Sequence, residues 1–150
     1  LMLRAKGKVT AISDFHRSSP MLWGHGLNKG QFEAASLVVT TEDGVVGIQG
    51  YAGTGKTTLL KAVNELADMM GFDVRGMAPS AAAAVELAKG SGIASQTLDS
   101  FLVEMQKVAE ASSPSSTANQ LWVLDESSLA SSRAKNELLQ LRESLGVHLV

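Results

Sequence analysis

The chain has 150 residues, a formal net charge of −2 and no cysteine. A chain of this length buries roughly two-thirds of its unfolded surface, so one domain is the default, and the slightly negative charge excludes a domain-wide basic surface for duplex DNA. The absence of cysteine excludes disulfides, thiolate metal sites and a cysteine nucleophile, and the three scattered histidines lack the spacing of a structural zinc site.

The first third of the chain predicts a helix, a strand and a second helix. Residues 1–26 form a leader segment of unclear role, and residues 27–39 fit a helix loosely before a turn at residues 42–44. The short apolar run at residues 45–48, bounded by glycines, is typical of a buried parallel strand. Apolar residues then recur at helical spacing up to Met70. The order of elements is therefore strand, glycine-rich loop, helix.

A second strand is predicted directly after this helix. Gly71 is well placed to end the helix. Phe72, Val74 and Met77 then alternate with polar residues and glycine, as in a strand. The pattern indicates the start of a βαβ alternation.

Two further helices follow the second strand. Pro79-Ser80 opens an alanine-rich helix near residues 81–88, and a turn is expected at Gly90 and Gly92. Thr97 is a plausible N-cap for the next helix. The apolar face of that helix consists of Leu98, Phe101, Leu102, Met105 and Val108.

The last third of the chain predicts a third strand and a closing helix. Residues 111–119, rich in serine, are expected to form a surface loop before a buried strand at residues 121–124. A leucine-rich helix then runs to Leu145 and is closed by Gly146. The final apolar run, residues 147–150, has no turn or cap after it, which indicates a fragment. The alternation predicts an α/β fold with a parallel sheet flanked by helices.

The segment Gly50-Tyr51-Ala52-Gly53-Thr54-Gly55-Lys56-Thr57 matches the phosphate-loop pattern, or Walker A motif, and lies between a predicted strand and helix. Glycines let the backbone curl so that N–H groups point at phosphate oxygens, and the helix N-terminus adds its positive dipole end. Lys56 would reach the β and γ phosphates of ATP, and Thr57 would supply a hydroxyl to Mg²⁺. Thr58 can add a phosphate contact. The alternative is an ordinary glycine turn.

Two adjacent acidic residues end the third strand. Asp125 emerges at the carboxyl edge of the sheet, where ligands bind in open α/β folds, and can hold Mg²⁺ through water. Glu126 can orient or deprotonate an attacking water, and this role favours an ATPase over a small-molecule kinase. Asp125 and Glu126 together correspond to a Walker B motif. The alternative for this pair is an acidic helix cap.

Taken together, several segments resemble superfamily 1B DNA helicases of RecD type, and in particular the helicase region of TraI-type conjugative relaxases. The resemblance covers roughly residue 27 to the end of the chain. It is carried by Gln31, Gly50 to Thr58, Ala78-Pro79-Ser80-Ala81, Thr97 to Leu102, and Asp125-Glu126. It implies that residues 27–150 form an N-terminal RecA-like ATP-binding lobe, truncated before the later helicase motifs.

The resemblance also implies roles for residues outside the phosphate loop. Gln31 inherits a contact to adenine, and Pro79, Ser80 and Ala81 inherit contacts to the backbone of single-stranded DNA. Thr97 falls at a second position of DNA contact. A surface glutamine, a helix start and an N-cap are the respective alternatives. Hydroxyls and helix-terminal N–H groups can meet phosphates without reading bases, so tracking would be independent of sequence.

The resemblance implies an ATP- and Mg²⁺-dependent helicase or translocase on single-stranded DNA, acting in conjugative DNA transfer. Its second RecA-like lobe, which carries the arginine finger, is missing, so full activity is expected only with that lobe. The alternative is a nucleotide- or DNA-binding module without turnover. Because the relaxase chemistry of such proteins uses an N-terminal tyrosine and the only tyrosine here, Tyr51, lies in the phosphate loop, no nicking activity is predicted.

The sequence also predicts the cellular location of the protein and the role of its two tryptophans. No apolar run approaches the roughly 20 residues that span a bilayer, and the start lacks the pattern of a signal peptide, so a cytoplasmic protein is expected. Trp23 and Trp122 could stack on bases, but packing is favoured for both, because Trp122 lies in a buried-type strand.

Overall fold

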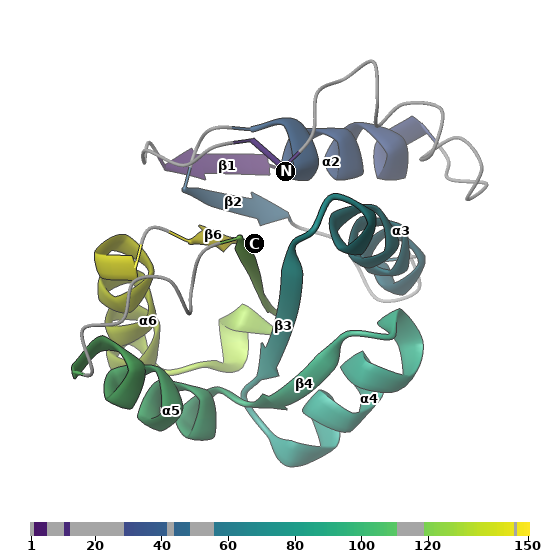
Figure 1. Cartoon of the computed structure of the whole chain (residues 1–150). Helices are drawn as coiled ribbons and strands as arrows, with labels where there is room; N and C mark the ends of the chain where they lie inside the picture. Colours follow the sequence, from purple (N-terminus) through teal and green to yellow (C-terminus); the bar gives the residue numbers. More distant parts are fainter. Residues whose placement is uncertain are drawn as a thin grey trace.

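A six-stranded sheet forms the centre of the computed structural model, which describes residues 2–5, 11–12, 29–41, 44–48, 56–110, 119–145 and 147–150. The strand order is β1-β2-β6-β5-β3-β4 (Figure 1). The described pairs are parallel except β1 with β2. The strands are β1 (Met2–Ala5), β2 (Val45–Ile48), β3 (Asp73–Ala78), β4 (Ala94–Thr97), β5 (Gln120–Leu124) and β6 (His148–Leu149).

Helices cover both faces of this sheet, which confirms the predicted α/β class. One layer contains α2, α3 and α4, and the opposite layer contains α5 and α6 (Figure 1). The helices are α2 (Lys29–Thr40), α3 (Lys56–Met69), α4 (Ala81–Ser91), α5 (Leu98–Glu110) and α6 (Ser132–Leu145), with a short 3₁₀ helix, η2 (Ser127–Leu129), after β5.

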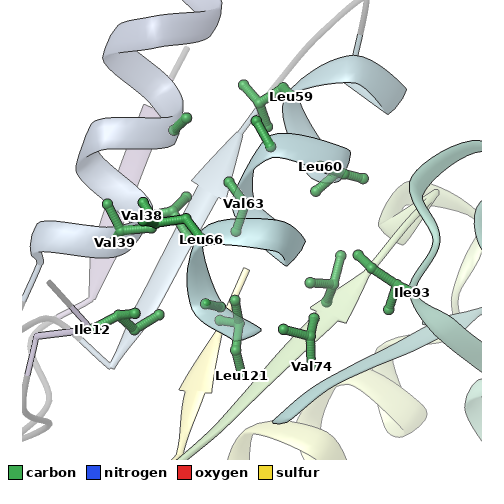
Figure 2. Close-up of a cluster of buried hydrophobic side chains, with 14 of the residues drawn as sticks. Ile12, Val38, Val39, Leu59, Leu60, Val63, Leu66, Val74, Ile93 and Leu121 are labelled. Carbon is green, nitrogen blue, oxygen red and sulfur yellow. The ribbon is translucent and has the colours of Figure 1, made fainter. Parts of the chain in front are cut away.

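The core has one part on each face of the sheet. On the α3 side, Leu59, Val63 and Leu66 pack against Val74 and Leu121 (Figure 2). A second cluster on the α5 and α6 side includes Met77, Phe101, Trp122 and Leu138. Residues of β3 and β5 therefore enter both clusters, as expected for parallel strands that are buried on both faces.

The alternation predicted for the second strand is wrong in detail. Phe72 precedes β3, and Val74 and Met77 belong to clusters on opposite faces of the sheet. An apolar residue on each face is what a central strand needs, because helices cover both of its sides. The strand itself is confirmed.

Several predicted helix boundaries are confirmed by their capping geometry. Gly71 adopts φ 81° after α3. The Ser80 Oγ accepts a hydrogen bond of 3.1 Å from the Ala83 N–H and caps α4. The Thr97 Oγ1 accepts a longer bond of 3.3 Å from the Ser100 N–H at the start of α5. Each cap satisfies a backbone group that a helix terminus leaves without an internal partner.

Three features between residues 1 and 97 differ from the predictions. The turn expected at Gly90 is wrong, because α4 continues to Ser91 and ends at Gly92, which adopts φ 76°. Strand β4 (Ala94–Thr97) was not predicted, and neither was β1 in the leader segment. Strand β4 lies at the sheet edge and contains only polar residues and alanine, so it carries no hydrophobic period.

Some predictions fall on residues outside the described ranges. They are the glycine-rich part of the phosphate loop, the greater part of the serine loop, and the closing glycine of the last helix. Residues 27–28 of the helix expected at residues 27–39, and Trp23, also lie there. In the described part, Trp122 is fully buried, and its ring meets Phe101 edge to face at 4.9 Å, which confirms its packing role.

A polar network joins β3 and β4 to α5. One Arg75 guanidinium nitrogen donates to Glu104 Oε2 at 2.9 Å and to Gln96 Oε1 at 3.2 Å. The Gln96 amide donates in turn to Glu104 and to the Ser100 hydroxyl. The guanidinium also lies 5.3 Å from the centre of the Phe101 ring. These contacts fix α5 against the edge of the sheet.

The network predicts a modest dependence of stability on pH. The hydrogen bond from Arg75 is the main cause that lowers the pKa of Glu104 below its ordinary 4.5, and partial burial opposes it. Because the folded pKa is lowered, the stabilisation is present above pH 4.5 and is lost as the pH falls through the folded pKa. Glu104→Gln should flatten this dependence in urea unfolding, and Glu110→Gln on the same helix should not. With Glu104 45% exposed, the effect should stay below about 1 kcal/mol.

Candidate nucleotide-binding site

An ion pair joins the start of α3 to the end of β5. The Lys56 Nζ lies 2.9 Å from Asp125 Oδ1, and the side chains are 40% and 20% exposed. Lys56 is the first residue of α3, and Asp125 directly follows β5. The Asp125 N–H donates to the Met77 carbonyl at 3.0 Å, so β3 fixes the backbone beneath the carboxylate. The lysine of the loop and the first acidic residue thus meet at the carboxyl edge of the sheet.

Glu126 has an uncommon backbone conformation beside this pair. Its φ and ψ are 52° and 42°, in the left-handed region that few residues other than glycine adopt. Its N–H donates to Asp125 Oδ1 at 3.0 Å. Its own side chain is exposed and makes no capping hydrogen bond to η2. The Glu126 side chain therefore does not cap η2, although the Glu126 backbone occupies the N-cap position and its carbonyl accepts a hydrogen bond of 3.0 Å from the Leu129 N–H.

The donor groups at this edge fit a magnesium–nucleotide complex. Thr57 and Thr58 lie in the exposed first turn of α3, where free N–H groups and the helix dipole favour anions. The Lys56 ammonium is a partner for phosphate, and the Thr57 hydroxyl and Asp125 carboxylate are the hard oxygen ligands that Mg²⁺ prefers. Three predicted phosphate ligands, Gly53, Thr54 and Gly55, lie outside the described residues.

The predicted DNA-contact residues lie at the carboxyl ends of two neighbouring strands, β3 and β4. In the register of β3 with β4, Ala78 pairs with Thr97, so residues 79–81 follow β3 just where Thr97 ends β4. Ser80 and Ala81 are exposed, and Thr97 is half-buried. The hydroxyls of Ser80 and Thr97 both cap helices. The structure therefore shows the helix start and the N-cap that were the alternatives to DNA contact at these two residues. The arrangement leaves the N-termini of α4 and α5 at the edge that carries Asp125.

Gln31 and Gly90 lie on α2 and α4, the two helices that pack against α3. Gln31 lies half-buried in the first turn of α2, and its neighbour Phe32 packs against the core cluster of α2 and α3. Gly90, near the end of α4, lies against the Thr57 side chain, a contact that was not predicted. A contact between two helices leaves no periodic pattern in the sequence. The only sequence feature at this contact is the glycine at position 90, near the end of the alanine-rich segment.

In the part of the chain that the structure describes, no helix is both long enough and apolar enough to cross a membrane.

The fold and the phosphate-loop motif define an α/β P-loop domain. The chain belongs to the AAA domain family, whose model matches residues 26–150. Membership of this family implies nucleotide binding.

Among curated proteins, the chain is 36% identical to the "Multifunctional conjugation protein TraI" of Escherichia coli (strain K12) over 107 residues, or 69% of this chain. It is 33% identical to the "Probable conjugal transfer protein TraA" of Sinorhizobium fredii over 106 residues, or 71% of this chain. The resemblance to TraI-type conjugative proteins is thereby confirmed. The matched regions span only 6% and 9% of these two relatives.

Proposed function

We propose that residues 27–150 form the ATP-binding, RecA-like lobe of an ATP-dependent helicase or translocase on single-stranded DNA, which acts in the cytoplasm in conjugative DNA transfer. The Lys56–Asp125 contact at 2.9 Å carries the proposal, because it joins the two motifs that ATP hydrolysis needs. The names of the relatives, a conjugation protein and a conjugal transfer protein, support the biological process.

The chemical roles follow from the residue types and their positions. Lys56 would bind the β and γ phosphates, together with the backbone of Gly53, Thr54 and Gly55. Bound Mg²⁺ would neutralise phosphate charge, held by the Thr57 hydroxyl and, through water, by Asp125. Thr58 would add a phosphate contact.

Glu126 would act on the attacking water, and Gln31 would contact adenine. Glu126 directly follows Asp125, the residue that would hold Mg²⁺, and its carboxylate is exposed, which supports a role on the attacking water. Gln31 belongs to α2, the helix that packs against α3. This packing supports a place for the base on the α2 side of the phosphate loop.

Single-stranded DNA would cross the edge where β3 and β4 end. Ser80 and Thr97 carry hydroxyls there, and the N-terminus of α4 at Ala81 adds backbone N–H groups, which suit contacts to phosphates rather than to bases. Pro79 has neither group, so it would contribute packing against the DNA backbone. The net charge of −2 agrees with a local contact of this kind. Turnover would need the second RecA-like lobe, because charge-stabilising groups for the transition state come from it.

A titration of the chain with ATP and Mg²⁺ tests the site. Lys56→Ala should weaken binding by about tenfold to a hundredfold, because a hydrogen bond to a charged group contributes about 1.5–3 kcal/mol. Lys61→Ala, which removes the same charge from an exposed position on the same helix, should bind as the wild type does. Equal binding by both variants, or no binding by the folded wild-type chain, would contradict the proposal.

A further inference from the structure

Helix α4 carries a glycine where the backbone does not need one. Gly90 is the penultimate residue of α4, and the positive φ that ends the helix belongs to Gly92. Glycine weakens a helix relative to alanine, so a glycine with ordinary helical geometry requires another reason. Its surroundings supply one.

The space beside Gly90 is filled by the side chain of Thr57. A Cβ placed on Gly90 would overlap the Thr57 methyl carbon, Cγ2. The same Cβ would lie 3.5 Å from the Thr57 Cβ and 3.6 Å from its hydroxyl oxygen, which are ordinary contact distances. Of these three Thr57 atoms, only the methyl carbon occupies space that a side chain at position 90 would fill.

This contact restricts the orientation of the Thr57 hydroxyl. The methyl and hydroxyl groups share one carbon, so a rotation that moves the methyl away from α4 also moves the hydroxyl. Threonine is stiff about this bond, and packing against α4 leaves it fewer orientations. The hydroxyl that would meet Mg²⁺ is therefore restricted to the orientations that keep the methyl group against α4.

We infer that Gly90 is a positioning residue for the nucleotide site, which acts through Thr57 by giving its methyl group a place against α4. The inference rests on the proposed function, because it assumes that the Thr57 hydroxyl is a ligand of Mg²⁺. Helix α4 would then serve two sites, because its first residue, Ala81, belongs to the proposed DNA-contact segment at residues 79–81.

A double-mutant cycle tests this role, with Mg²⁺–ATP affinity measured by calorimetry. Gly90→Ala should weaken binding by about tenfold, since residues in contact commonly couple by about 0.5–3 kcal/mol, and tenfold corresponds to about 1.4 kcal/mol. Thr57→Ser removes the methyl and keeps the hydroxyl. In the Thr57→Ser background, Gly90→Ala should therefore change the affinity by less than about twofold.

Two controls separate positioning from a general loss of structure. Lys89→Ala makes the same new residue at the neighbouring exposed position of the same turn, and it should leave affinity unchanged. Without Mg²⁺, the effect of Gly90→Ala on ATP binding should disappear, because the hydroxyl acts through the metal. A fold defect would reduce binding with and without Mg²⁺.

The outcomes distinguish this inference from the proposed function. If the wild-type chain binds Mg²⁺–ATP and Gly90→Ala binds equally well, the role of Gly90 is wrong and the proposed function stands. If Gly90→Ala binds Mg²⁺–ATP weakly or fails to fold, and adding Thr57→Ser does not restore the binding, the methyl contact is not the cause. The inference is then also wrong. If the folded wild-type chain binds no Mg²⁺–ATP, the proposed function itself fails.

Discussion

Glu126→Gln in the full-length gene product should keep Mg²⁺–ATP binding and lower DNA-stimulated hydrolysis by about 10²–10⁴-fold, the range of general base catalysis. Glutamine has the size of glutamate but cannot accept the proton of the attacking water. The Glu126 side chain is exposed and makes no cap to η2, so little structure should depend on its charge. Steady-state hydrolysis with and without single-stranded DNA, together with a nucleotide titration, measures both parts of this prediction.

A matched control for this variant is Glu143→Gln, the same chemical change at an exposed position on α6. It should alter neither binding nor hydrolysis. Unchanged hydrolysis by Glu126→Gln would remove Glu126 from the proposed mechanism. If single-stranded DNA fails to stimulate the unmodified protein, the motor proposal loses to a regulatory ATPase.

The central elements of the fold could be predicted because they rest on local patterns. The apolar run at residues 45–48 and the run at residues 121–124 are continuous, since both faces of these strands are covered. Ser80 and Thr97 mark helix starts by chemistry that acts within four residues. Signals of this kind need no knowledge of the tertiary structure.

Other elements depend on contacts that are distant in sequence. Strand β1 pairs antiparallel with β2, 40 or more residues further along the chain, and β4 is held by β3 rather than by its own apolar residues. Gly90 was predicted as a turn because glycine usually interrupts helices. The helix α4 instead continues through Gly90 to Ser91, and the packing of the Thr57 side chain against Gly90 gives a reason for a small residue at this position.

The candidate site shows the same division. The rule that parallel strands end at one ligand-binding edge was sufficient to place Asp125 near the phosphate loop, and its carboxylate pairs with Lys56. The left-handed backbone of Glu126 could not be predicted, because glutamate has no preference for that region. In the structure it occurs together with a hydrogen bond that the Glu126 N–H donates to the Asp125 carboxylate.

Trp122→Ala should be the most destabilising of the substitutions considered, at about 3–5 kcal/mol, the usual cost of truncating a buried aromatic residue to alanine. The Trp122 side chain is fully buried, its ring contacts Phe101 edge to face, and its indole N–H donates to Gln120 Oε1 at 2.9 Å. Each of these contacts is lost together with the volume of the ring. The melting temperature should fall by about 10 °C in a chain of this size.

Two variants of Trp122 together separate a role in packing from a role in DNA binding. Trp122→Phe keeps an aromatic ring against Phe101 and loses the hydrogen bond to Gln120, so it should cost clearly less than Trp122→Ala in urea unfolding. At a temperature where both variants are folded, their affinity for single-stranded DNA should match the wild type, because a ring with no exposed surface cannot stack on a base. A small loss of stability with a large loss of DNA affinity would instead place Trp122 in the DNA path.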